Sequence, residues 1–187
     1  MHWVVIKSEI QKYAGDEKLY QSKLIEKNKK TILDAEIAMP GREDDKTRID
    51  LMHYDKSRKK IVAVEVKLIQ DHRLYSDEII KQLQKYHNFM KTKATDIASA
   101  YLNVIRVKKA LGLLEDETLI KLENHNLEVE NRILLCLIGY NQVMINIFKE
   151  KRLKEIVKPD IMLGVYFFGK DGGDLNSHTG KNKIIFA

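Results

Sequence analysis

Two short stretches decide the fold of this chain: RIDLMHY at residues 48–54 and IVAVEVKL at residues 61–68. The first begins with polar–apolar alternation and the second is almost continuously apolar, which is typical of strands inside a sheet. A charged segment, DKSRKK at residues 55–60, separates them and predicts a β-hairpin with its turn there. Away from that turn, both strands end in charged side chains, which an apolar strand does not need for folding.

The spacing brings these charged side chains together. Successive side chains of a strand point to opposite faces, so Glu65 and Lys67 share one face of the second strand. Asp50 shares a face with Met52 on the first strand. A turn at 55–60 sets Asp50 opposite Glu65, with Cβ atoms about 4.5–5.5 Å apart. Two carboxylates at that separation destabilise the fold unless a cation neutralises them.

Two cations are candidates for that role. Lys67 is one, and a divalent cation suits the site better, because Mg²⁺ and Mn²⁺ bind a few carboxylate and carbonyl oxygens and keep several waters. The predicted ligands are the carboxylates of Asp50 and Glu65 and the backbone carbonyl of Val66. In the alternative reading, Asp50 is an ordinary strand-end residue, and Glu65 and Lys67 form an exposed ion pair.

The rest of the chain surrounds the hairpin with helices and further strands. In the C-terminal third, strand–helix–strand spacing predicts a parallel crossover. The expected fold is therefore α/β, with an αβββαβ core at about 16–168 and a mixed central sheet flanked by helices in a single domain, 1–187. The expected elements are helices at 16–30, 76–90, 95–111 and 142–156, strands at 31–39, 47–54, 61–68, 133–140, 161–168 and 184–186, an acidic, partly helical insertion at 113–131, and a flexible loop at 169–183.

Composition narrows the class of protein. No apolar stretch is long enough to cross a bilayer, so no membrane partner is expected. The N-terminus lacks the pattern of a signal peptide and Cys136 is the single cysteine, which together favour a cytoplasmic location. The histidines show no ligand spacing for zinc. A net charge of +6 and a pI of about 9.2 fit a nucleic-acid partner, although solvated lysines alone could produce the same numbers.

Two further elements place polar side chains where they can face the hairpin. Gln82 and Tyr86 are four residues apart in the helix that follows, so they lie on one helical face and can point together at the sheet. Glu17 lies in the first turn of the first helix, on the same side as Tyr20 and Leu24. A glutamate there also interacts favourably with the helix dipole, and both roles remain open for Glu17.

Together these motifs resemble the PD-(D/E)XK nuclease superfamily. Asp50 matches its first acidic position, with Ile49 where the name-giving proline would stand, and 65–67 match the (D/E)XK element. Gln82 and Tyr86 resemble the QxxxY motif of the RecB-type branch. The resemblance covers about residues 16–90 and implies a restriction-endonuclease-like fold and hydrolysis of phosphodiester bonds by a metal-activated water.

The resemblance also implies roles for individual residues. Asp50 and Glu65 would bind Mg²⁺ or Mn²⁺, and Lys67 would be the catalytic lysine. Gln82 and Tyr86 would position that lysine or the scissile phosphate. Glu17 would be the glutamate that the family's first helix often supplies.

The expected substrate is DNA, which the basic helices would contact through its phosphate backbone without sequence specificity. An alternative is a catalytically silent nuclease-like module that binds nucleic acid or a protein. A third reading is an immunity or restriction component whose acidic 113–131 segment docks a partner. The sequence leaves open whether the substrate is single- or double-stranded, and whether the protein forms a homodimer.

Overall fold

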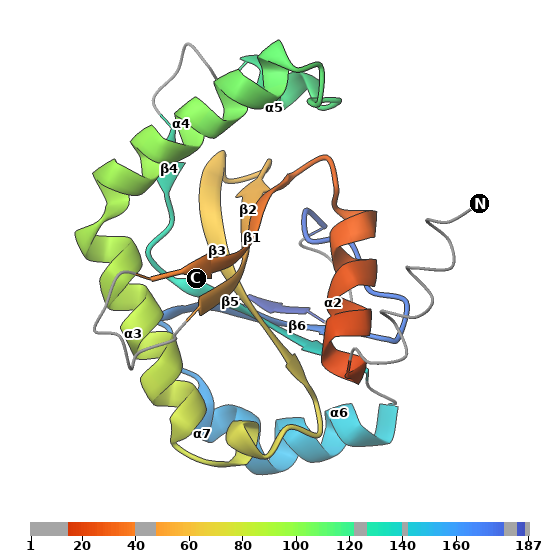
Figure 1. Ribbon diagram of the computed structural model, residues 1–187. Helices are drawn as coiled ribbons and strands as arrows, with labels where there is room; N and C mark the ends of the chain where they lie inside the picture. The colour runs from red at the N-terminus through yellow and green to blue at the C-terminus, as the bar shows by residue number, and fades with distance from the viewer. Residues whose placement is uncertain (1–14, 40–47, 122–126, 140–141, 178–182, 186–187) are drawn as a thin grey trace.

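A mixed sheet with helices on both faces forms the centre of the molecule (Figure 1). The computed structural model describes residues 15–39, 48–121, 127–139, 142–177 and 183–185. Its elements are α2 (Asp16–Lys27), β1 (Ile32–Ala38), β2 (Arg48–Asp55), β3 (Lys60–Leu68), a 3₁₀ turn (His72–Tyr75), α3 (Glu78–Thr92), α4 (Ala94–Ala110), α5 (Glu117–Lys121), β4 (Glu128–Val129), β5 (Ile133–Ile138), α6 (Gln142–Phe148), a π-helical turn (Lys149–Leu153), α7 (Lys154–Ile156), β6 (Met162–Phe168) and β7 (Lys183–Ile185).

Within the described residues the sheet has seven strands in the order β1-β2-β3-β5-β6-β7, with β4 beside β3. β1, β2 and β3 form an antiparallel meander, whereas β3, β5 and β6 run parallel and β7 returns antiparallel along β6. The predicted α/β class, the mixed sheet and the parallel crossover from β5 to β6 are confirmed. The sequence did not predict β4, a two-residue strand in the acidic segment.

The β2–β3 hairpin has the predicted turn and register. Tyr54 pairs with Ile61 and Met52 pairs with Ala63, so the loop closes between Asp55 and Lys60 as the charged hexapeptide indicated. Continuing the same register by one step beyond the pair of Leu51 and Val64 would set residue 50 against residue 65. The charged ends of both strands therefore lie together at the end of the hairpin opposite its turn, along one edge of the sheet.

Each face of the sheet has its own apolar core. On one face, α2 packs Tyr20 and Leu24 against Val62, Val64 and Val66. On the other face, α3, α4 and α6 pack against the opposite side chains of the same strands, among them Ile61 and Ala63 (Figure 1). Alternation along β3 thus serves both layers, which explains why this strand is apolar almost throughout.

The helices follow from the spacing of their apolar residues. In α3, Ile79, Leu83, Tyr86 and Met90 are all buried, as expected of an amphipathic helix with one face on a sheet. The helix begins at Glu78, with Asp77 as the preceding cap residue, and the hydroxyl of Ser76 accepts a hydrogen bond from the backbone N–H of Glu78 at 3.3 Å. In the part of the chain that the structure describes, no helix combines the length and the apolarity needed to cross a bilayer.

The predicted helix 142–156 is divided by the π-helical turn, which carries a buried arginine. Arg152 donates from Nε to the carbonyl of Leu74 at 2.8 Å and from Nη2 to the carbonyl of Ser76 at 2.6 Å. These carbonyls lie in the 3₁₀ turn and directly before α3. Arg152 therefore fixes the segment that leads into α3 from the opposite end of the sequence.

The acidic segment is partly helical, as expected, with α5 at its centre and residues 122–126 outside the described ranges. Its carboxylates contact lysines of the same chain. Asp116 pairs with Lys56, and Glu115 lies 3.8 Å from the ammonium groups of both Lys29 and Lys30. The charge expected to attract a partner is thus partly neutralised within the molecule.

The beginning of the predicted C-terminal loop packs against α2. Asn28 donates from Nδ2 to the carbonyl of Gly173 at 2.7 Å, and its Oδ1 accepts from the N–H of Leu175 at 2.9 Å. Leu175 itself is buried in the α2-side core. The edge strand expected at 184–186 is present as β7, although Phe186 lies outside the described residues.

Candidate active site

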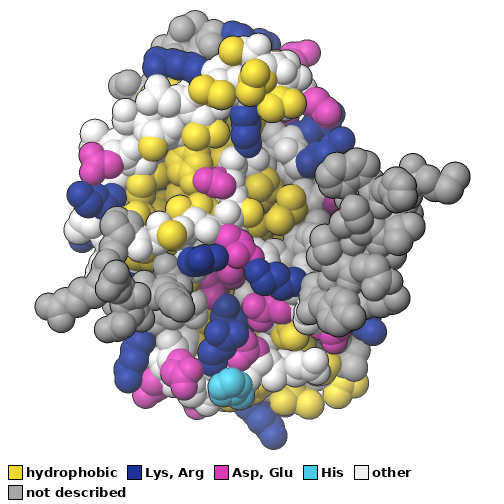
Figure 2. Space-filling model, viewed as in Figure 1, with side chains coloured by type: hydrophobic (Ala, Val, Ile, Leu, Met, Phe, Trp, Pro, Cys, Tyr) yellow, Lys and Arg dark blue, Asp and Glu magenta, His cyan; other side chains and the backbone are white. Residues whose placement is uncertain are grey.

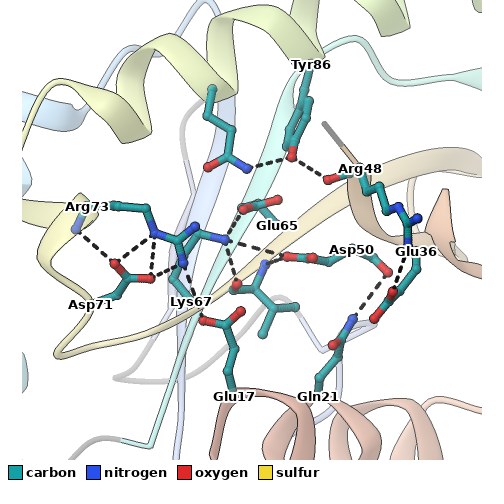
Figure 3. Close-up of polar contacts among 12 residues, drawn as sticks. Glu17, Gln21, Glu36, Arg48, Asp50, Glu65, Lys67, Asp71, Arg73 and Tyr86 are labelled. Atoms are coloured by element: carbon teal, nitrogen blue, oxygen red, sulfur yellow. Dashed lines mark hydrogen bonds and ion pairs between the residues drawn. The ribbon is translucent and has the colours of Figure 1, made fainter. Parts of the chain in front are cut away.

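A polar cavity opens at the charged edge of the hairpin (Figure 3). Its volume is about 560 Å³, and its walls come from α2, β2, β3, the 3₁₀ turn and α3. The residues that line it are Glu17, Arg48, Asp50, Glu65, Lys67, Arg73, Glu78, Lys81, Gln82 and Lys85. Five of the six side chains proposed from the sequence therefore face one cavity, and the sixth, Tyr86, lies behind it.

Lys67 lies among the three groups that the sequence suggests as metal ligands. Its ammonium pairs with the Glu65 carboxylate, donates to the Val66 carbonyl at 3.2 Å and lies 4.0 Å from Oδ2 of Asp50. Only 3% of Lys67 is exposed. The ammonium of Lys67 therefore contacts or lies near all three oxygen groups.

Asp50 is fixed by a hydrogen bond that continues the sheet. Its Oδ2 accepts from the backbone N–H of Val66 at 2.7 Å, just beyond the pair of Leu51 and Val64 at this end of the β2–β3 ladder. The side chain thus replaces a backbone partner, and its remaining surface faces the cavity, where 22% of it is exposed. Asp50 is the most accessible of the oxygen groups around Lys67.

Glu65 is completely buried, and within the described residues its Oε2 has no hydrogen-bond partner. The pKa of its carboxyl is raised from 4.5 to about 8; burial is the main cause, the charge of Asp50 adds to it, and Lys67 opposes both. Burial lowers the pKa of Lys67, but the charges of Glu65 and Asp50 outweigh it and raise the pKa overall. The negative charge of Asp50 contributes to both shifts, whereas burial is the main cause of the raised pKa of Glu65.

These groups fit a small divalent cation. Among the described residues Oε2 of Glu65 has no hydrogen-bond partner, Asp50 is accessible from the cavity, and the Val66 carbonyl contacts the same ammonium group as Glu65. The described residues hold no cluster of three or more His, Cys, Asp or Glu side chains that could bind a metal. Two carboxylates and a carbonyl are a sparse donor set, which suits Mg²⁺ because this ion keeps several waters.

Gln82 and Tyr86 attach α3 to the start of β2. Gln82 donates from Nε2 to the Tyr86 hydroxyl at 2.6 Å, and that hydroxyl donates to the backbone carbonyl of Arg48. Burial, and next the charge of Glu65, raise the pKa of Tyr86 well above its ordinary range, so the hydroxyl remains a donor. The pair lies together as predicted, with Gln82 at the cavity wall and Tyr86 buried against β2.

Glu17 reaches the cavity from α2. Its Oε2 lies 3.8 Å from Nη2 of Arg73, which the sequence did not suggest as a site residue. Asp71 orients this arginine, because both of its carboxylate oxygens accept from Nε of Arg73 at 3.0 Å. Glu17 thus contributes both to the helix N-terminus and to the charged wall of the cavity (Figure 3).

Sequence reasoning also missed Glu78, Lys81 and Lys85. They lie four residues before, one before and three after Gln82, so helical periodicity around that glutamine could have found them. No comparable signal in the sequence identifies Arg73, because its place at the cavity depends on the course of the 3₁₀ turn, which sequence periodicity does not predict. On the rim of the cavity these lysines, Arg48 and Arg73 outnumber the carboxylates of Glu17 and Glu78.

Comparison of the chain with protein-family models, with curated proteins and with solved structures finds no match. The interpretation of the cavity therefore depends on its own geometry and chemistry. That geometry consists of a buried acid–lysine pair, an accessible aspartate and a basic rim.

The raised pKa of Glu65 predicts how stability depends on pH. Between about pH 5 and pH 8 the native state keeps a proton on Glu65 that the unfolded state, with a pKa near 4.5, has released. The free energy of unfolding should therefore fall as pH rises through this window and level off above it. Urea denaturation of the metal-free protein at intervals from pH 5 to pH 9 measures this slope. Glu65→Gln is the control and should show a flatter profile; equal slopes would contradict the assignment.

Proposed function

We propose that this protein is a metal-dependent nuclease of the PD-(D/E)XK type, with a restriction-endonuclease-like fold, that hydrolyses phosphodiester bonds of DNA. One observation carries the proposal: Asp50, Glu65 and Lys67 meet at a single polar cavity, and Gln82 of the next helix lines the same cavity. An exposed, merely solvated acid–lysine pair would not explain why Glu65 and Lys67 are almost completely buried.

In this proposal Asp50, Glu65 and the Val66 carbonyl hold a divalent cation, Mg²⁺ or Mn²⁺. When bound, such an ion supplies Lewis-acid activation of water and compensates negative charge on the phosphate. The chain contributes the shape of the site: the backbone N–H of Val66 orients Asp50, and Tyr86 fixes the start of the strand that carries it.

The protein's own cations act on the substrate. Lys67 is held by Glu65 and lies at the inner end of the cavity, where its ammonium can stabilise charge that develops on the phosphate. Arg48, Arg73 and Lys81 line the same cavity and can bind adjacent phosphates. Contacts of this kind position the backbone of a nucleic acid and do not discriminate between bases, so the proposed substrate is DNA of any sequence.

A second candidate is the catalytically silent module that binds nucleic acid without cutting it. The contacts of Lys67 favour it, because this ammonium already occupies Glu65 and the Val66 carbonyl. If those contacts persist in the presence of metal, Glu65 and Val66 are not available as ligands. The two candidates share the basic cavity and differ only in whether a divalent cation binds.

The test is cleavage of labelled single- and double-stranded DNA in Mg²⁺, Mn²⁺ or EDTA. The proposal expects cleavage in Mg²⁺ or Mn²⁺, none in EDTA, and loss of cleavage in Glu65→Gln purified in parallel, which excludes a contaminating nuclease. Glu65→Gln keeps the shape of the side chain and removes its charge. DNA binding without metal-dependent cleavage would favour the silent module, and equal cleavage by the variant would overturn the proposed site.

A further inference from the structure

A second cavity, largely apolar, lies beside the polar cavity that Asp50 and Glu65 line, which we call the carboxylate cavity. It has a volume of about 390 Å³ and runs between the β1–β2 edge of the sheet and the helices α3 and α4. Figure 2 shows apolar side chains gathered in this area of the surface, next to the charged groups at the sheet edge. The apolar groove, as we call it, is lined by Asp34, Ile37, Met52, Phe89, Lys93, Asp96, Ile97, Ala100, Tyr101 and Val104.

The groove continues the carboxylate cavity along two elements. On β2, Asp50 lines the first cavity and Met52, the next residue on the same face, lines the groove. On α3, Lys85 lines the first cavity and Phe89, one helical turn further, lines the groove. One helical turn is about 5.4 Å, so a ligand in the carboxylate cavity needs only a short extension to reach Phe89.

Charge and apolar surface are arranged in sequence along α3. Lys81, Lys85 and Phe89 follow one another at intervals of four residues on α3, and Lys93, directly after the helix, continues the same interval. Phe89 is half-buried, so part of its ring remains accessible. Lys93 shares its charge with Asp96 at 3.3 Å, whereas Lys81 is exposed at the rim of the carboxylate cavity. A basic row interrupted by an aromatic ring is typical of surfaces that bind single-stranded nucleic acids.

We propose that the apolar groove binds an unpaired base of single-stranded DNA, stacked on Phe89, while neighbouring phosphates follow the lysine row into the carboxylate cavity. This inference rests on the proposed function and names its substrate class. Tyr101 donates to Asp34 at 3.4 Å on the groove wall, and Asp34 is exposed there. A carboxylate in that position can accept a hydrogen bond from an exocyclic amino group of a base.

Two features favour a single strand over a duplex. In a duplex the bases are paired and stacked inside, so a base would have to be extruded before it could enter a lateral groove. In addition, the groups that would act on the phosphate are recessed: Glu65 is fully buried and Lys67 nearly so. A single strand is narrower and more flexible than a duplex and can approach these groups without such a cost.

The experiment measures binding separately from cleavage. Fluorescence anisotropy of the protein in EDTA compares single- and double-stranded oligonucleotides of the same length. We expect the single strand to bind at least about tenfold more tightly, and Phe89→Leu to weaken single-strand binding by about tenfold with little effect on the duplex. Leucine keeps the apolar packing of this position and removes the aromatic face. Phe89→Tyr should retain the affinity, and Asn88→Ala, an exposed neighbour on α3 outside the groove, should not change it.

A set of oligonucleotides with one abasic position each locates the stacked base. At one position, loss of the base should weaken binding by wild type as much as Phe89→Leu does, and should cost little more in that variant, because both changes remove the same contact. Equal binding of single strand and duplex, or an unchanged affinity of Phe89→Leu, would overturn the inference even if the protein cleaves DNA. Tight single-strand binding through Phe89 without any metal-dependent cleavage would instead overturn the proposed nuclease and leave the groove standing.

Discussion

Asp50→Asn is expected to lower the rate of metal-dependent DNA cleavage by at least about 10²-fold, in the range observed when one preorganised electrostatic group is removed from an active site. Asn keeps an oxygen that can accept the N–H of Val66, so the hydrogen bond at 2.7 Å can be retained. The negative charge at the most accessible proposed ligand is lost. Initial rates on labelled DNA at saturating Mg²⁺, together with thermal unfolding of both proteins, measure the effect.

Glu128→Gln is the matched control for this variant. Glu128 of β4 pairs with Lys60 at 3.1 Å near the turn of the hairpin, whereas Asp50 lies at the other end of the hairpin, and a surface pair of this kind contributes little to stability. We expect its cleavage rate to stay within about twofold of wild type, since the variant changes no group of the site. Full activity of Asp50→Asn would show that the proposed metal position is wrong.

Lys67→Met should destabilise the protein by about 3–5 kcal/mol at pH 8, the usual cost of removing one partner of a buried ion pair. Glu65 would then be completely buried without its cation, and could remain in the fold only by binding a proton. Since the pKa of Glu65 already lies near 8 with the lysine present, binding this proton becomes easier as pH falls. The loss measured by urea denaturation should therefore be smaller at pH 5 than at pH 8.

The double variant Glu65→Gln/Lys67→Met separates this effect from a simple loss of packing. It removes both charges, so the buried site no longer needs a proton or a cation. We expect it to recover much of the stability at pH 8 and to lose the pH dependence. If the double variant is as unstable as Lys67→Met, the single variant loses stability because the packing of the lysine side chain is lost, and not because its charge is lost.

The central sheet could be predicted because its signals are local. Six charged or polar residues between two apolar runs set the hairpin turn, and the turn fixed the pairing of Tyr54 with Ile61. Even spacing of apolar residues in α3 identified its buried face. The short strand β4 and the π-helical turn were not predicted, because two residues of strand and five residues of π-helix have no periodicity of their own.

For the candidate site, the sequence indicated the residues that share a strand or a helix face. Asp50, Glu65 and Lys67 follow from alternation, and Gln82 and Tyr86 follow from helical spacing. The sequence did not reveal Arg73, since its position depends on the course of the 3₁₀ turn. Neither did it reveal that Lys67 would contact Glu65 and Val66 together, because that depends on side-chain rotamers at a buried strand end.

The contacts of Arg152 bear on how short a fragment of this chain can be and still keep the region before α3 in place. Every motif residue proposed for catalysis lies between positions 17 and 86, so a fragment of the first hundred residues would look complete when judged by its motifs. The guanidinium that holds the carbonyls of Leu74 and Ser76 belongs to Arg152, which lies far beyond Tyr86 in the sequence. A fragment that contains all the motifs would therefore lack the arginine that holds the segment before α3 in place.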